Sequence, residues 1–159
     1  MGMSPYECHC ERHPVKATLL LCDAAQVDPA GKVHILGAGW TVVTVARGAP
    51  VLAHAVVAIV HVPWNETHEP HWLRLRLEDE DGRPVMIGPA PDQLAPLIHE
   101  QQIEVGRPPG APEGITFDVP VVVSVGPGMP LTEGRYSWRL EIDGASDEDW
   151  FVSFHVRVT

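Results

Sequence analysis

Segments in which every second residue is apolar recur along this chain, and this period of two restricts its fold more than any other feature. Residues 72–78 alternate leucines with charged side chains, and residues 135–142 and 150–158 place an aromatic or aliphatic side chain at every second position. Successive side chains of a β-strand point to opposite faces, so each segment reads as a strand with one buried and one solvated face. We therefore expect sheets that hide their apolar faces against each other.

Turn signals separate these segments. Asp-Gly pairs at 81–82 and 143–144 follow alternating runs and predict hairpins. Residues 55–62 are apolar at consecutive positions, as in a central strand buried on both faces. With almost no helical periodicity, the pattern predicts an all-β fold of about eight to nine strands. The expected architecture is a two-sheet antiparallel β-sandwich, either immunoglobulin-like or jelly-roll-like.

Some stretches have a weaker pattern. Residues 17–25 are read as one first strand, and residues 88–102 as a loop because prolines interrupt them. Residues 103–105 are read as a short strand. Residues 115–119 and 121–125 predict two strands, or one strand bent at Pro120.

The chain has 159 residues, the size of a single domain, and we assign residues 15–159 to it. Residues 1–14 are expected to be a disordered tail. Lysine is rare while arginine, alanine and valine are abundant, which is typical of GC-rich codons and suggests that translation starts at Val15. The alternative is a zinc-binding hook built from the cysteines and histidines of residues 8–13.

The net charge of −10 excludes some classes of partner. Phosphate backbones and anionic membrane surfaces are repelled by most of the protein, so we expect neither nucleic acid nor membrane as a partner. The N-terminal residues lack the basic start and apolar middle of a signal peptide, and three cysteines cannot all pair. These features predict a cytoplasmic protein.

A group of histidines near residue 65 is the best candidate for a metal site. His61, His68 and His71 lie close in sequence to Glu66 and Glu69, and imidazole and carboxylate groups are zinc ligands. The spacing matches no zinc motif, and a closed site needs another ligand. No cofactor is predicted, and zinc enters only with the alternative of a metal-binding protein or metal-dependent enzyme that uses the region of His61, His68 and His71.

No catalytic residue can be assigned. Gly37-Ala38-Gly39 precedes β-branched residues instead of a helix, which argues against a dinucleotide site. Ser124 and Ser137 lie within strand patterns and not in a nucleophile elbow.

Tryptophans suggest where a partner could bind. Trp138 and Trp150 are in phase with apolar neighbours and are expected in the core. Trp64 follows a proline at a strand end, and together with Trp72 it is the candidate interface.

Several segments together carry a resemblance to a bacterial family of unknown function found mainly in actinobacteria. They are residues 19–26, 31–41, 62–64, 79–82, 105–108 and 134–144. The resemblance covers nearly everything after Val15 and implies a small, cytoplasmic, β-rich protein. It implies no activity, cofactor or catalytic residue. The function most consistent with the sequence is therefore a non-enzymatic binding or assembly module that contacts a protein partner or associates with itself.

Overall fold

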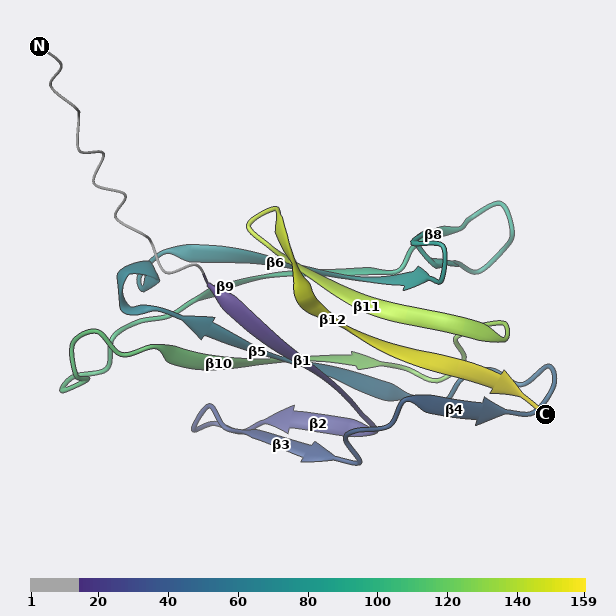
Figure 1. The fold of residues 1–159 in the computed structure, drawn as a ribbon, viewed down its shortest axis with the longest axis horizontal. Coiled ribbons are helices and arrows are strands. Elements are labelled where there is room, and N and C mark those ends of the chain that lie inside the picture. The colour runs from purple at the N-terminus through teal and green to yellow at the C-terminus, as the bar shows by residue number, and fades with distance from the viewer. Residues whose placement is uncertain (1–14) are drawn as a thin grey trace, which may run out of the picture.

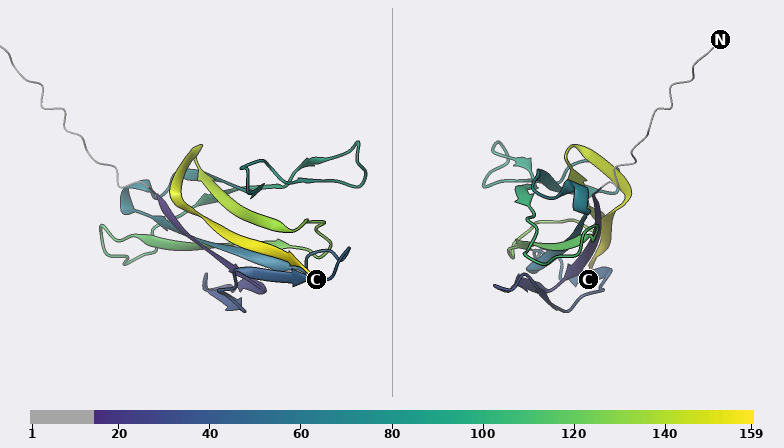
Figure 2. Two further views of the ribbon diagram at one scale, coloured as in Figure 1. Left: turned by 45° about the vertical axis from the view of Figure 1, so that its right-hand side comes forward. Right: turned by 90° about the vertical axis from the view of Figure 1, so that its left-hand side faces the viewer.

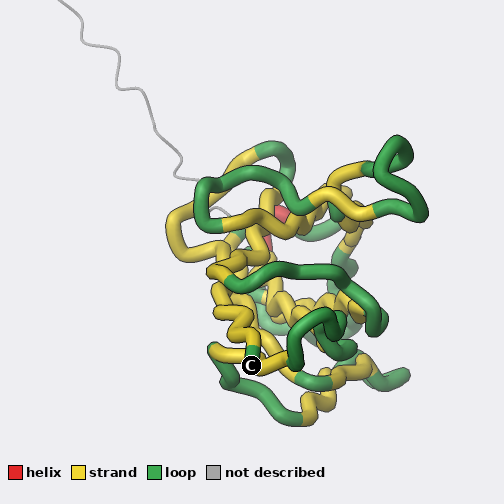
Figure 3. Tube along the Cα trace, turned by 90° about the vertical axis from the view of Figure 1, so that its right-hand side faces the viewer, coloured by secondary structure: helices red, strands yellow, loops and turns green. Residues whose placement is uncertain are grey.

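The structure of the protein, a computed structural model, describes residues 15–159. These residues form an all-β fold with twelve strands in four sheets and one short 3-10 helix, η1 (Trp64–Glu66). Figure 3 shows that the rest of the described chain is strand or loop. The expected tail at 1–14 and the cysteine and histidine cluster at 8–13 lie outside the described residues.

The smaller of the two main sheets has three antiparallel strands, in the order β1-β5-β10 (Figure 1). They are β1 (Lys16–Cys22), β5 (His54–Val62) and β10 (Phe117–Val125). β5 lies in the centre and its residues are buried on both faces except for partial exposure at Ile59 and His61. The expected central strand is therefore confirmed.

The larger sheet has five strands in the order β4-β12-β11-β6-β9. They are β4 (Val42–Val45), β12 (Ala145–Val158), β11 (Gly134–Ile142), β6 (Pro70–Asp79) and β9 (Ile98–Glu104). β4 runs parallel to β12, and the other neighbours are antiparallel. This sheet curls like a half-barrel, as the turned views of Figure 2 show.

Two short hairpins form the remaining sheets. β2 (Ala24–Val27) pairs with β3 (Val33–Leu36), and β7 (Met86–Ile87) pairs with β8 (Ala95–Pro96). The β2–β3 hairpin covers the outer face of the three-stranded sheet, where its apolar side chains pack on a small cluster formed by Cys22, Ala55 and Val57. This cover explains why β5 can be apolar on both faces.

One hydrophobic core takes side chains from both main sheets. Leu73, Leu75 and Leu77 are buried, which confirms the alternation read in residues 72–78. Each buried leucine contributes about 1.5–3 kcal/mol relative to an exposed one. The expected inward residues of the last two strands are also in the core, including Trp138 and Trp150.

The all-β class is confirmed, but the simple two-sheet antiparallel sandwich is not what the structure shows. The short hairpins form sheets of their own, the five-stranded sheet curls, and its β4–β12 pair is parallel. The expected first strand, 17–25, divides at Asp23 because the chain turns there from β1 into β2. These divisions raise the number of strands above the eight or nine expected.

One local prediction needs correction. Residues 88–102, expected as a loop, contain β8 and most of β9, which begins five residues before the predicted strand at 103. Of the two alternatives for residues 115–125, the structure shows the single strand: β10 covers residues 117–125 with Pro120 inside it. An edge strand tolerates this proline because a nitrogen facing away from the neighbouring strand has no bond to lose.

No helix within residues 15–159 has the length and apolar character needed to cross a membrane.

Candidate functional site

The three histidines of the predicted metal site bind different partners. His61 Nδ1 lies 2.6 Å from Asp118 Oδ1, and its Nε2 lies 3.1 Å from Thr18 Oγ1. His68 occupies a turn with a φ of 64°, and its N–H donates to the Val105 carbonyl at 2.8 Å. Residues 15–159 bring together no group of three or more histidine, cysteine or acidic side chains that could hold a metal ion. The structure therefore gives the metal hypothesis at His61, His68 and His71 no support.

His71 is a buried cation. Its Nδ1 lies 2.7 Å from Asp143 Oδ2 and its Nε2 lies 3.1 Å from the Glu66 carbonyl oxygen. Both partners can only accept, so both ring nitrogens carry hydrogen. Burial alone lowers the pKa of His71, but the hydrogen bonds and the Asp143 charge outweigh it and raise the pKa above its ordinary value. His71 thereby joins the start of β6 to the β11–β12 turn.

Trp64 is held by two neighbours. The Arg107 guanidinium lies over the Trp64 ring, 4.1 Å from its centroid, and the Phe117 ring stacks on Trp64 with the two centroids 6.2 Å apart. Arg107 also donates to the Trp64 carbonyl at 2.6 Å and to Thr67 Oγ1 at 2.7 Å. Trp64 therefore holds the loop that contains Arg107 against η1, and it also lines an open hollow of about 560 Å³ together with Lys16 and His61.

Trp72, the second residue of the predicted interface, is available to a partner. Its side chain is 58% exposed. It lies on the outer face of β6, directly opposite Gln102 of the edge strand β9. Because β6 alternates, the residues on either side of Trp72 along the strand point into the core.

A larger hollow lies at another part of the molecule, beside the edge strand β4. It has a volume of about 740 Å³ and is lined by Asp23, the loop from Gly37 to Trp40, most of β4, and the segment from Val51 to His54. Val42 and Leu52 line it with exposed fractions of 51% and 71%, and Leu36, 65% exposed, directly precedes the lining loop. These are three of the six large apolar side chains that are exposed in residues 15–159.

Aromatic rings form the inner side of this hollow. Trp40 packs edge-on against His54 and Phe154, with ring centroids 5.8 and 5.7 Å apart. The Nε1–H of Trp40 is buried and has no acceptor among the described residues. An unsatisfied buried donor of this kind costs stability.

His54 is neutral and fixed in one tautomer. Trp138 Nε1–H donates to His54 Nε2 at 3.3 Å, and His54 Nδ1–H donates to the Leu52 carbonyl at 3.3 Å. Burial lowers the pKa of His54, and the hydrogen bond to Leu52 opposes this only in part. Both nitrogens are engaged, so His54 supports the hollow and is no free base for catalysis.

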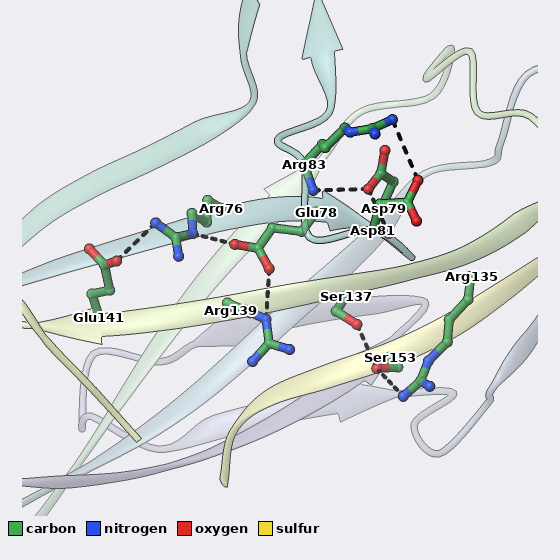
Figure 4. Close-up of polar contacts among 10 residues, drawn as sticks. All are labelled: Arg76, Glu78, Asp79, Asp81, Arg83, Arg135, Ser137, Arg139, Glu141 and Ser153. Carbon is green, nitrogen blue, oxygen red and sulfur yellow. Dashed lines mark hydrogen bonds and ion pairs between the residues drawn. The ribbon is translucent and has the colours of Figure 1, made fainter. Parts of the chain in front are cut away.

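A second candidate for a catalytic site is a network of charged side chains on the outer face of the five-stranded sheet (Figure 4). Glu78, buried, lies 2.7 Å from both Arg76 Nε and Arg139 Nε, and Arg76 Nη1 lies 2.9 Å from Glu141 Oε1. Two guanidinium groups hold the Glu78 carboxylate, so both of its oxygens already have partners. The network therefore ties β6 to β11 and offers no acid–base pair.

Comparison with known proteins assigns the chain to a family. The model of the family of unknown function DUF6941 matches residues 17–157, nearly the whole chain. The chain belongs to the DUF6941 family. No curated protein and no solved structure matches this DUF6941 chain. Membership of a family of unknown function was expected from the resemblance and is confirmed, whereas the predicted bacterial distribution of the family stays a prediction.

Sequence reasoning did not find the hollow of this DUF6941 protein. The segment Gly37-Ala38-Gly39 was interpreted only as a poor dinucleotide motif. A tryptophan directly after this Gly-Ala-Gly segment, followed by an edge strand with an exposed valine, was the available signal. The other wall, residues 51–54, could not be placed beside it without the tertiary structure.

Proposed function

We propose that this DUF6941 protein is a non-enzymatic binding module that takes an apolar side chain of a protein partner into the hollow beside β4. The observation that carries the proposal is the gathering of exposed apolar side chains at this hollow, with Val42 and Leu52 in its lining. Isolated exposed apolar residues are ordinary on protein surfaces, but a group of them around a concave site is typical of a binding surface.

Charge defines the partner further. Asp23 is exposed in the lining and has no ion pair among the described residues, and the lining contains no lysine or arginine. A partner with a lysine or arginine next to its apolar side chain would pair with Asp23, and the net charge of −10 would attract it from a distance.

Binding fits this site better than catalysis. His54 is its single histidine, and both ring nitrogens of His54 already have partners. Asp23 and Thr44 are the remaining lining residues whose side chains could transfer a proton or attack a substrate, and neither has a hydrogen-bonded base beside it.

Selection from a displayed library of random dodecapeptides tests the proposal. Peptides are selected on the full chain and counter-selected on the Leu52→Glu variant, which places a charge in the apolar rim. We expect enriched peptides that combine an apolar residue with a neighbouring lysine or arginine. Their affinity for Leu52→Glu should fall at least about tenfold.

The matched control is Leu94→Glu, the same change at an exposed leucine of the β7–β8 loop. Circular dichroism and urea unfolding show whether both variants are folded. Enriched peptides should bind the Leu94→Glu variant as tightly as the unchanged chain. If no peptide survives counter-selection, or if peptides bind Leu52→Glu equally well, the proposal is wrong.

A further inference from the structure

β9 is an edge strand of the five-stranded sheet, and one of its edges has no partner strand within residues 15–159. In that range β9 pairs with β6 and with no other strand. The N–H of Leu77 donates to the carbonyl of Leu97, in line with the β6–β9 register, so the odd-numbered residues of β9 bond toward β6. The even-numbered residues, 98, 100, 102 and 104, therefore direct their backbone N–H and C=O groups away from the sheet. None of these groups bonds to another described segment.

The other edges of the main sheets are better protected. β10 carries Pro120, which removes a donor from its edge, and β4 is only four residues long. β1 lies alongside β12 of the other sheet. β9 is seven residues long and contains no proline and no lysine, which are the usual devices that prevent strands from pairing at an edge.

The side chains of β9 indicate what kind of strand would pair with it. Glu100 and Glu104 are exposed on its outer face, and β9 itself has no cationic residue. Arg74 of β6 approaches Glu100 at 3.4 Å, while Glu104 has no ion pair among the described residues. A partner strand with lysine or arginine at alternate positions would place cations opposite both glutamates.

A second copy of this chain is a poor partner for the free edge of β9. Antiparallel pairing of two β9 strands centred on Gln102 sets Glu100 of each copy opposite Glu104 of the other. Pairing centred on Glu100 sets two identical glutamates opposite each other. Each copy also carries a net charge of −10, so the two molecules repel before they meet.

We propose that β9 accepts an added antiparallel strand from a basic, extended segment of a protein partner. The backbone groups of the even-numbered residues supply the hydrogen bonds, and Glu100 and Glu104 select the cations. Trp72, exposed on the same face opposite Gln102, offers a flat apolar surface to long cationic side chains that reach across β9. This mode of recognition is β-augmentation. It uses a surface separate from the hollow beside β4.

A fluorescent heptapeptide with the sequence Lys-Val-Lys-Val-Lys-Val-Lys, capped at both ends, is the probe. Fluorescence anisotropy at low salt measures its binding to the full chain. We expect saturable binding at micromolar concentration. N-methylation of alternate residues removes backbone donors while keeping every side chain and charge. One peptide is N-methylated at its odd positions and the other at its even positions. The peptide whose methyl groups replace the N–H groups that face β9 should bind at least about tenfold more weakly than the other.

Charge reversal tests the position. The double variant Glu100→Lys, Glu104→Lys should weaken binding at least about tenfold. The matched control Glu80→Lys, Glu133→Lys makes the same change in net charge at exposed turn residues and should keep most of the affinity. Leu52→Glu should leave binding of this probe unchanged, so the outcome is independent of the proposed function at the hollow.

Gln102→Pro is a second variant, and it leaves the net charge of the protein unchanged. It removes an outward N–H of β9 without removing a bond to β6, so we expect a folded protein that binds the probe several-fold more weakly. The proposal is overturned if the probe fails to bind at millimolar concentration. It is also overturned if the two N-methylated peptides bind alike, or if both charge-reversed variants lose affinity equally.

Discussion

His71 and Asp143, 72 positions apart in sequence, meet at 2.7 Å and hold the start of β6 to the turn between β11 and β12. Asp143 has a φ of 52°, and its second carboxylate oxygen accepts the N–H of Trp72 at 2.8 Å. The carboxylate is half exposed whereas the imidazole is buried. The pair is therefore a point where protonation affects how two strand ends are joined.

Asp143→Asn is expected to destabilise the protein in a manner that depends on pH. The raised pKa of His71 means that the folded state holds its proton more tightly than the unfolded state, whose pKa is near 6.5. The stabilisation is complete below that pH and is lost as the pH rises through the pKa of the folded state. Urea unfolding should show a loss of about 2 kcal/mol near pH 5.5 and a much smaller loss near pH 9.

Asp118→Asn is the control, because Asp118 contacts the less buried His61 and is itself mostly exposed. Its effect should be within about 0.5 kcal/mol at either pH. An Asp143→Asn effect that is equal at both pH values would show that His71 is not charged in the folded protein.

His54 should produce the opposite dependence on pH. Its lowered pKa means that the folded state resists protonation, so its contribution is present above the pKa of the unfolded histidine, near 6.5. That contribution is lost as the pH falls toward the pKa of the folded state. His54→Phe removes the titrating group, and the stability of this variant should fall less between about pH 7 and pH 5 than that of the unchanged chain. A variant with an unaltered pH profile would contradict a neutral, buried His54.

Glu78→Gln should destabilise the protein by about 2–3 kcal/mol in urea unfolding. The substitution leaves Arg76 and Arg139 without their shared, buried carboxylate. Glu141→Gln is the matched control because Glu141 is more exposed and contacts Arg76 alone, and it should cost less than about 1 kcal/mol. Equal effects of the two substitutions would contradict the central position of Glu78 in the network of Figure 4.

Gly37→Ala should cost at least about 2 kcal/mol in thermal or urea unfolding. Gly37 has a φ of 63°, and an added Cβ would overlap Asp23 Oδ2. Gly31→Ala shares the positive φ but meets no atom within 4 Å, so it should cost about 1 kcal/mol.

Adding Asp23→Ala to Gly37→Ala should restore part of the lost stability, because it removes the carboxylate that the new Cβ meets. Stability that stays as low as in Gly37→Ala alone would show that the close approach of these two residues does not matter.

The sequence predicted strands well where one face is solvated. The leucines of β6 and the aromatic residues of β11 alternate with polar residues, and both strands were found with nearly correct bounds. Most of β9 was missed because an edge strand needs few apolar side chains, and its run His99-Glu100-Gln101-Gln102 has none. The alternation of apolar and polar residues therefore identifies strands whose inner face is fully apolar, and it fails for strands at the edge of a sheet.

The candidate sites are formed by contacts between residues far apart in the chain, and the spacing of residues in the sequence does not reveal such contacts. Trp64 was noted, but its contacts with Arg107 and Phe117 join it to segments that are more than 40 residues away. His61 and His71 each pair with an aspartate far along the chain instead of with each other. Proximity in sequence suggested a metal site, but His61 and His71 lie on strands of different sheets, β5 and β6.

The most direct test of the proposed function is a ¹⁵N–¹H correlation NMR titration of the full chain with the capped dipeptide acetyl-Leu-Arg-amide. It combines the apolar side chain and the cation that the hollow beside β4 is proposed to bind. We expect saturable changes in amide chemical shift, concentrated at residues 40–44 and 51–54, at millimolar peptide. The proposed function is contradicted if the chemical shifts of those amides do not change, or if the changes lie elsewhere on the protein.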